Sequence, residues 1–198
     1  MLKKYFQKSV VEAGLDEAGR GCFSGPVYAA AVILPEGFDH RILNDSKQLN
    51  EKQRNILRVE IEHSALAWAV AMVDNNEIDE INILNASFLA MHRALDKLSS
   101  TPEFLLIDGN RFHAYKDIPH ECIVKGDATF QSIAAASVLA KTHRDEYMVS
   151  IHQHYPEYNW VNNKGYPTRD HKDAINRYGI TEYHRKSFNM NEQLKIDL

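Results

Sequence analysis

Four carboxylates follow short apolar or tightly turned segments of the chain: Asp16, Glu17, Asp108 and Asp127. A carboxylate buried without a partner is strongly destabilising, so acids in such positions suggest that something neutralises or coordinates them. A site with four carboxylates and no His or Cys offers only oxygen ligands, which suits Mg²⁺ or Mn²⁺ rather than zinc. Such sites typically hold two ions about 3.5–4 Å apart and promote in-line displacement at phosphorus. The acids therefore predict metal-dependent phosphoryl transfer.

Some of these acids also have an ordinary structural explanation when taken alone. Asp108 precedes Gly109 after an apolar run, which is typical of a turn, and Asp127 precedes a helical pattern, which is typical of an N-cap. Neither role occupies every lone pair of a carboxylate, so both remain compatible with metal binding. Asp16 and Glu17 are harder to explain, because two acids between an apolar strand and a Gly-Arg-Gly bend make a poor surface loop.

The apolar pattern predicts strands that later alternate with helices. Strands are expected at residues 11–16, 26–34, 64–73, 103–110 and 121–127. Helices are expected at residues 51–63, 81–98, 128–155 and 168–179. In the first helix Asn50 is the expected cap, with Ile56, Leu57 and Ile61 facing inward, and Gly179 is the expected stop of the last. This order predicts an α/β fold: a mixed sheet with helices on both faces and a small helical C-terminal part from about residue 155.

The predicted strands bring the acids together under one condition. If the first strand and the strand before Asp108 are neighbours, Asp16 and Asp108 meet at the carboxyl ends of those strands, where α/β domains gather their sites. Glu17 joins them only if the chain turns at once, because successive strand residues point to opposite faces. The glycines at positions 19 and 21 permit such a turn.

Charge gives a weaker signal than the acids. The formal net charge of the 198 residues is −4, which provides no overall basic field for nucleic acid. Residues 164–186 contain six Lys or Arg against three Asp or Glu, and His171 and His184 are available to add to that excess. The C-terminal part is therefore the expected contact with a phosphate backbone.

The remaining composition favours an intracellular protein. Cys22 and Cys122 form no disulfide framework and show no metal-ligand spacing, which indicates a reducing cytoplasm. The N-terminal residues do not read as a secretory signal, and the longest apolar runs are too short to cross a membrane. The spacing of His152 and His154 puts them on different sides of a helix, so they, His113 and His171 are interpreted as surface histidines.

Six motifs stand in order from about residue 10 to residue 188: GLDEAGRG with GPVYAAAVIL, NDSKQL, LLIDGN, KGDATFQSIAAASVLAKTHRDEYM, NKGYPTRDH and YHRKSF. Together they resemble bacterial ribonuclease HII, the type 2 ribonuclease H. The resemblance implies a ribonuclease-H-like fold, one catalytic domain over residues 1–198, and a metal-dependent endonuclease. Its implied substrates are RNA in RNA–DNA hybrids and single ribonucleotides in duplex DNA, cut on their 5′ side during ribonucleotide excision repair. Two Mg²⁺ or Mn²⁺ ions are implied, and the products are 5′-phosphate and 3′-hydroxyl ends.

The same resemblance implies a role for individual residues. Asp16, Glu17, Asp108 and Asp127 match the metal-binding and catalytic carboxylates. Gly19, Arg20 and Gly21 match an element that reads the ribose 2′-hydroxyl, the group that distinguishes RNA from DNA. Tyr166 matches a tyrosine that stacks on the neighbouring deoxyribose; without its motif, a half-buried core tyrosine is the simpler interpretation. The expected phosphate contacts are Lys47, Lys141, Arg144 and Arg185, although a solvated helix face also explains Arg144.

Other functions leave part of this pattern unexplained. A non-catalytic nucleic-acid-binding module on the same fold does not need the four carboxylates. A metal-dependent nuclease acting on DNA accounts for the acids but not for the Gly-Arg-Gly element or Tyr166. A type 3 ribonuclease H needs an additional N-terminal domain. The expected protein is a monomer that binds nucleic acid and no membrane, and its last ten residues contain no recognisable sliding-clamp peptide.

Overall fold

Five strands form one mixed sheet in the order β3-β2-β1-β4-β5. The computed structural model describes residues 2–40, 42–43 and 49–189. The strands are β1 Glu12–Ala18, β2 Val27–Ile33, β3 Ala67–Val73, β4 Phe104–Asp108 and β5 His120–Ile123. The first three pair antiparallel, whereas β4 runs parallel to both β1 and β5. The central strand β1 therefore lies beside β4, as the meeting of Asp16 and Asp108 requires.

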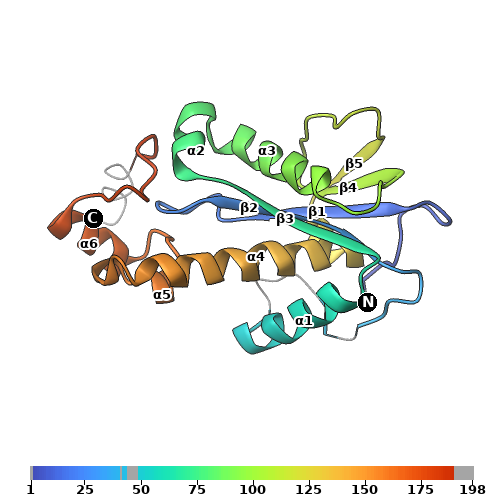
Figure 1. Ribbon diagram of the computed structural model, residues 1–198, viewed down its shortest axis with the longest axis horizontal. Coiled ribbons are helices and arrows are strands. Elements are labelled where there is room, and N and C mark those ends of the chain that lie inside the picture. Colours follow the sequence, from blue (N-terminus) through green and yellow to red (C-terminus); the bar gives the residue numbers. More distant parts are fainter. Residues whose placement is uncertain (1, 41, 44–48, 190–198) are drawn as a thin grey trace.

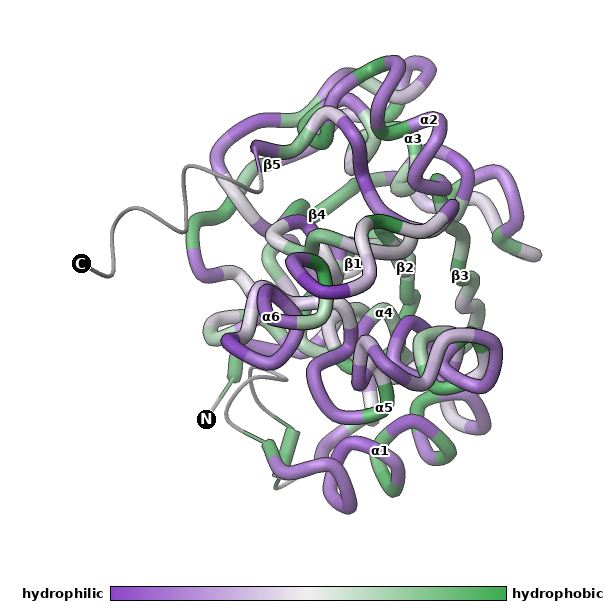
Figure 2. The backbone as a smooth tube through the Cα atoms, turned by 90° about the vertical axis from the view of Figure 1, so that its left-hand side faces the viewer, coloured by the Kyte–Doolittle hydropathy of each residue, from purple (hydrophilic) through white to green (hydrophobic). Residues whose placement is uncertain are grey.

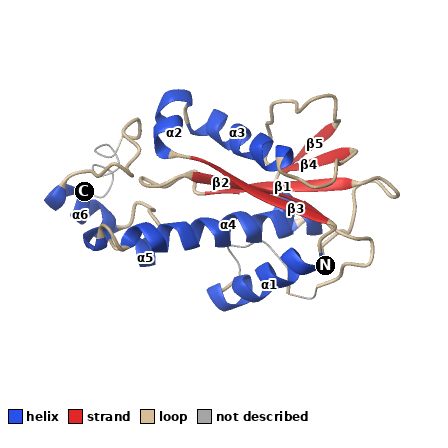
Figure 3. Ribbon diagram, in the orientation of Figure 1, coloured by secondary structure: helices blue, strands red, loops and turns tan. Residues whose placement is uncertain are grey.

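Helices cover both faces of this sheet. They are α1 Glu51–Ser64, α2 Asn75–Ile81, α3 Ile83–Asp96, α4 Gln131–His152, α5 Trp160–Asn163 and α6 Arg169–Tyr178, with 3₁₀ turns η1 Gly126–Ala128 and η2 Pro156–Tyr158. Helices α2 and α3 lie on one face, and α4 and α1 lie on the other (Figures 1 and 3). Hydrophobic residues follow the central strands, and hydrophilic residues surround them (Figure 2). The expected α/β fold, a ribonuclease-H-like mixed sheet between helices, is confirmed.

Strand alternation divides the core into two layers. Ala13 and Leu15 of β1 belong to the cluster that packs under α3, whereas Ala18 belongs to the cluster that packs against α4. The first half of α4 is buried almost throughout, which explains its continuous run of apolar and small residues. Even-numbered residues of β1 therefore face α4, and odd-numbered residues face α3.

Several local expectations need correction. Asn50 does cap α1, but Ile56 is 50% exposed while Leu57 and Ile61 are buried. The expected helix over 81–98 is α3, which begins only at Ile83 because Asn82 adopts a φ of 66° and caps it; Ile81 ends a separate helix, α2, which the sequence pattern did not predict. The expected strand at 121–127 ends at Ile123 and continues as a turn into η1.

Gly14 sets how closely α4 approaches β1. A Cβ atom at this position would lie 2.2 Å from the carbonyl carbon of Ser132 and 2.4 Å from the amide nitrogen of Ile133, both backbone atoms at the start of α4. Backbone cannot swing aside as a flexible side chain can. The close contact places α4 directly against the strand that carries Asp16 two residues later.

We expect Gly14→Ala to lower the free energy of unfolding by about 1–3 kcal/mol or more, because the added methyl group displaces the start of α4. Urea unfolding measures the loss. Gly37→Ala is the matched control, since no atom lies within 4 Å of the added Cβ. Equal stability of the two variants would show that the approach of α4 does not depend on Gly14.

Candidate active site

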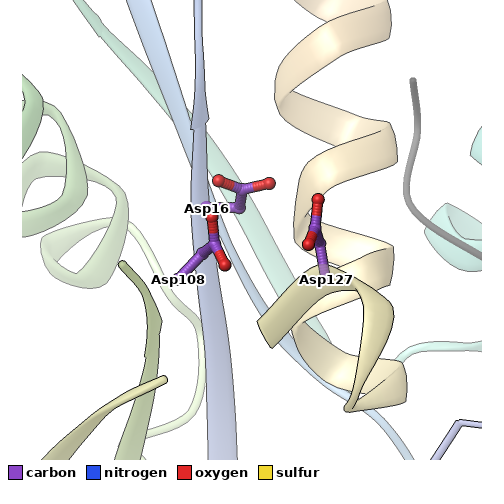
Figure 4. A group of neighbouring side chains, drawn as sticks. All are labelled: Asp16, Asp108 and Asp127. Atoms are coloured by element: carbon purple, nitrogen blue, oxygen red, sulfur yellow. The ribbon is translucent and has the colours of Figure 1, made fainter. Parts of the chain in front are cut away.

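Three aspartates from separate parts of the chain converge beside β1. Asp16 comes from β1, Asp108 from the end of β4 and Asp127 from η1, the turn that leads to α4 (Figure 4). One carboxylate oxygen from each lies within 4.8 Å of the others. Asp16 and Asp127 are buried, and Asp108 is half-buried. Such a set of oxygen donors fits a hard divalent cation such as Mg²⁺ or Mn²⁺.

Backbone hydrogen bonds fix two of these carboxylates. Asp108 Oδ1 accepts a hydrogen bond of 2.7 Å from the amide of Gly126, which directly precedes Asp127. Asp16 Oδ1 accepts one of 2.7 Å from the amide of Glu17. The end of β4 and the turn that carries the third aspartate are therefore linked directly.

The segment after Asp127 is held by the N-terminal residues. The amide of Lys3 donates to the carbonyl of Thr129 at 2.8 Å, and the amide of Gln131 donates to the carbonyl of Lys3 at 2.9 Å. Phe130, not Asp127, is the N-cap of α4, and its side chain makes no capping hydrogen bond. The N-cap explanation for Asp127 is therefore wrong.

Crowding of negative charge makes Asp16 hard to ionise. Burial raises the pKa of this carboxyl well above its ordinary value of 3.8, and the charges of Glu17 and Asp108 raise it further. A hydrogen bond with Ser137 of α4 opposes the shift only in part. Binding a cation would relieve the same repulsion, because an adjacent positive charge favours the ionised form.

Glu17 does not belong to the group of three. Strand β1 continues to Ala18, so the chain does not turn immediately after Asp16, and the side chain of Glu17 starts from the opposite face of the sheet. Its carboxylate pairs with Arg20 at 3.1 Å. Participation of Glu17 as a fourth ligand remains a prediction.

Arg185 holds the glycine loop, residues 19–25, from inside the protein. Its Nη2, Nη1 and Nε donate to the carbonyls of Gly19 at 2.7 Å, Arg20 at 2.9 Å and Gly25 at 2.9 Å. Arg185 is fully buried, and burial lowers its pKa to about 10, which leaves it charged at neutral pH. In this structure the guanidinium donates to loop carbonyls and has no exposed surface, so the expected phosphate contact through this side chain stays a prediction.

Arg144 has the same kind of role. It is fully buried on α4 and donates to the carbonyls of Pro26 at 2.9 Å, Lys164 at 2.8 Å and Ser24 at 3.0 Å. Gly19 leaves room for this side chain: it has a φ of 97°, and a Cβ there would lie 2.0 Å from the Nε of Arg144. Neither a phosphate contact nor a solvated face describes Arg144.

The other predicted contacts lie around the same loop. Arg20 and Gly21 are exposed, and nothing lies within 4 Å of a Cβ built on Gly21. Tyr166 is 36% exposed. Lys141 pairs with Asp145 at 2.6 Å and places its Nζ 5.7 Å from the centre of the tyrosine ring.

Two predictions concern residues outside the part of the chain that the structure describes. One is Lys47 as a phosphate contact, and the other is the lack of a clamp-binding peptide at the C-terminus, where residues 190–198 are not described. Among the described residues, no helix is long and apolar enough to cross a membrane.

The sequence interpretation missed a buried pair of histidines. His171 and His184 are both fully buried, although His171 was expected on the surface and both were expected to add positive charge. Burial lowers the pKa of both rings, that of His184 to about 3, so they are neutral at pH 7. The burial of His171 could have been predicted from its position three residues before Ala174, the other buried residue of α6, because residues three apart share one face of a helix.

The raised pKa of Asp16 predicts how stability depends on pH. The folded state keeps this proton to higher pH than the unfolded chain, so the free energy of unfolding of the metal-free protein falls as pH rises above the ordinary value of 3.8 and through the folded pKa. Each tenfold difference in proton affinity between the two states amounts to about 1.4 kcal/mol. We therefore expect metal-free Asp16→Asn to be more stable than the wild type at neutral pH, in thermal unfolding followed by circular dichroism.

Addition of Mg²⁺ is expected to make the wild type the more stable of the two proteins. A free Mg²⁺ concentration of 100 times the dissociation constant stabilises the protein that binds it by about 2.7 kcal/mol. Asp117→Asn, a change on an exposed loop, is the control and should follow the wild type. A metal-free Asp16→Asn variant that is less stable than the wild type would show that the carboxylate is structural.

Known proteins resemble this chain over nearly its whole length. The sequence model of the family described as Ribonuclease HII matches residues 13–191. Ribonuclease HII of Bacteroides thetaiotaomicron is 63% identical over 190 residues, which cover 96% of this chain and 95% of that protein.

Solved structures share the fold. The ribonuclease H2 of Pyrococcus horikoshii has a TM-score of 0.75 at 25% identity, covering 94% of this chain and 97% of that one. Bst-RNase HIII in complex with Mn²⁺ has a TM-score of 0.71 at 20% identity, covering 95% of this chain and 70% of that one. The family model spans all three aspartates, the glycine loop and Tyr166. The chain therefore belongs to the ribonuclease HII family, endoribonucleases that act on RNA–DNA hybrids.

Proposed function

We propose that this chain cuts RNA–DNA hybrids and also duplex DNA on the 5′ side of a single embedded ribonucleotide. The observation that carries the proposal is the position of the glycine loop directly after β1, the strand that holds Asp16. Because the loop follows the strand that carries Asp16, a ribose bound by the loop lies beside a phosphate bound at the aspartates. An enzyme so arranged can test the 2′-hydroxyl and cut the adjacent bond in one binding event.

The proposed cofactor is Mg²⁺ or Mn²⁺, with two ions bound during catalysis. Three carboxylates with oxygens within 4.8 Å of one another, without a His or Cys in the group, support a hard cation. The structure of Bst-RNase HIII in complex with Mn²⁺ has a similar fold. When bound, the ions supply an activated water and neutralise charge at the scissile phosphate and at the 3′ oxygen that leaves. The products are then 5′-phosphate and 3′-hydroxyl ends.

The chain's own residues orient the reaction. Asp16, Asp108 and Asp127 are proposed to hold the ions. Glu17 is proposed as the fourth carboxylate; to join them it has to leave Arg20, and the end of β1 has to change conformation, because its side chain starts from the other face of the sheet. The exposed amides and carbonyls at the tip of the glycine loop are available to the ribose, because glycine lets the backbone approach a sugar closely.

Four further side chains are proposed to recognise the substrate. Tyr166, partly exposed beside Lys141, is proposed to stack on the deoxyribose at the junction. Arg169, Arg177 and Lys186 are the exposed basic residues of the segment 164–186 and are suited to the duplex backbone.

We also propose the extent of the catalytic domain, the oligomeric state and the cellular compartment of the protein. The catalytic domain spans residues 1–198, with the part from about residue 155 contributing to substrate binding. The protein acts as a cytoplasmic monomer in ribonucleotide excision repair. The free thiols of Cys22 and Cys122 support a reducing compartment. Light scattering coupled to gel filtration tests the monomer.

The decisive experiment compares two duplexes that differ in one 2′-hydroxyl. In Mg²⁺, we expect the wild type to nick the duplex that carries one ribonucleotide on the 5′ side of that nucleotide, and to leave the all-DNA duplex intact. Denaturing electrophoresis of an end-labelled strand maps the cut. Equal cutting of both duplexes would favour a DNA nuclease and overturn the proposal.

Asp108→Asn tests the carboxylate site within that assay. Loss of a group that only orients a metal ligand costs about 10–100-fold, so loss of the ligand itself is expected to cost more than about 100-fold in kcat/KM. The variant should retain the wild-type circular dichroism spectrum, and Asp117→Asn should keep full activity. An Asp108→Asn variant that unfolds would instead assign this carboxylate a structural role.

A further inference from the structure

Two buried side chains touch both loops that are proposed to read the substrate. Arg144 donates to the carbonyl of Ser24, in the glycine loop, and to that of Lys164, in the tyrosine loop, residues 163–167. His171 of α6 places its Nε2 3.2 Å from the hydroxyl of Ser24 and its Nδ1 2.9 Å from the carbonyl oxygen of Tyr166. The two loops also share a backbone hydrogen bond, from the amide of Phe23 to the carbonyl of Gly165 at 2.8 Å, and a contact of 3.7 Å from the Cys22 sulfur to the carbonyl of Lys164. His171 thus adds one more link between segments that are far apart in the sequence.

The hydrogen-bond partners determine which nitrogen of His171 carries the proton. The carbonyl of Tyr166 can only accept, so Nδ1 must donate to it. The indole Nε1 of Trp160 can only donate, and it lies 3.1 Å from Nε2, so Nε2 must accept. The neutral tautomer with a proton on Nδ1 satisfies both partners, and a second proton on Nε2 would face the indole N–H.

His184 completes the arrangement. The backbone amide of Thr181 donates to its Nδ1 at 2.9 Å, which leaves the proton of the neutral ring on Nε2. That Nε2 lies 3.3 Å from Nε2 of His171, whose single lone pair is shared among the N–H groups of His184 and Trp160 and the hydroxyl of Ser24. His184 is followed directly by Arg185, whose guanidinium holds three carbonyls of the glycine loop. The two rings therefore form a buried connection between α6, the glycine loop and the tyrosine loop.

We propose that His171 is a positioning residue that couples the glycine loop to the tyrosine loop, and so sets the preference for an RNA-to-DNA junction over a continuous hybrid. The inference rests on the proposed function, in which the glycine loop reads the ribose and Tyr166 reads the sugar beyond it. At a junction the ribose and the next deoxyribose lie at a fixed distance and orientation from each other. Loops that are coupled already have the matching arrangement, so binding requires no reorganisation and costs less free energy.

Two variants break the link at different ends. Ser24→Ala removes only the hydroxyl that contacts Nε2, in a side chain that is fully buried and small. His171→Asn keeps a donor near the position of Nδ1 but cannot reach Ser24. Both are expected to lower the ratio of kcat/KM on the single-ribonucleotide duplex to kcat/KM on the continuous hybrid. A fall of about fivefold corresponds to one ordinary buried hydrogen bond.

Ser87→Ala is the matched control. It also removes a buried serine hydroxyl, which donates to the carbonyl of Ile83 at 2.9 Å, but Ser87 lies on α3 and outside both loops. We expect this variant to keep the wild-type substrate ratio. If Ser87→Ala lowers the ratio as far as Ser24→Ala does, or if neither Ser24→Ala nor His171→Asn lowers it, the proposal is wrong.

A second readout does not depend on activity. Amide hydrogen exchange followed by mass spectrometry reports the two loops as separate peptides. Ser24→Ala and His171→Asn should each increase exchange in both loops together, while Ser87→Ala should not. An increase confined to one loop would refute the coupling. If the wild type cuts neither RNA-containing substrate, the proposed function fails by itself, and the exchange experiment still decides whether His171 couples the loops.

Discussion

Mutual repulsion among buried carboxylates is the interaction that the rest of this structure has to oppose. Asp16, Asp108 and Asp127 bring oxygens within 4.8 Å of one another, and burial with neighbouring charge raises the pKa of Asp16. Parallel pairing of β1 with β4 brings the first two together, and the apolar half of α4 holds η1, with Asp127, beside them. The stability of the sheet and of α4 thus maintains a concentration of negative charge that a divalent cation neutralises.

Two positively charged side chains support the glycine loop, which is proposed to bind the sugar. Arg144 and Arg185 are buried, and each donates to three backbone carbonyls. A loop outside the sheet ladder has no strand to satisfy its carbonyls, so the two planar guanidinium groups fill that need. The backbone of the glycine loop is thereby fixed before any substrate arrives, which is the condition for accurate recognition of a single hydroxyl.

The corrections that concern basic residues share one cause. Arg and Lys are almost never fully buried, so a basic residue in a nucleic-acid-binding protein is most simply interpreted as exposed. Arg144, Arg185 and His171 differ because backbone carbonyls from distant segments accept their hydrogen bonds, and no local sequence pattern indicates such partners. The prediction for Ile56 was wrong for a different reason: its position in a helical repeat fits an inward face, but the buried face of α1 is narrower than the repeat suggests.

The order of the five strands, the cap at Asn50, the stop at Gly179 and the three converging aspartates could be predicted from the sequence, because each depends on periodicity or on a residue type suited to one local conformation. Six motifs in order also identified the family. Tertiary contacts were needed to show that Glu17 starts from the other face of β1, that two arginines donate to the backbone, and that His171 contacts two loops. These depend on where strand β1 ends and on contacts between segments as much as 166 residues apart, such as Arg185 with Gly19, which spacing along the chain does not encode.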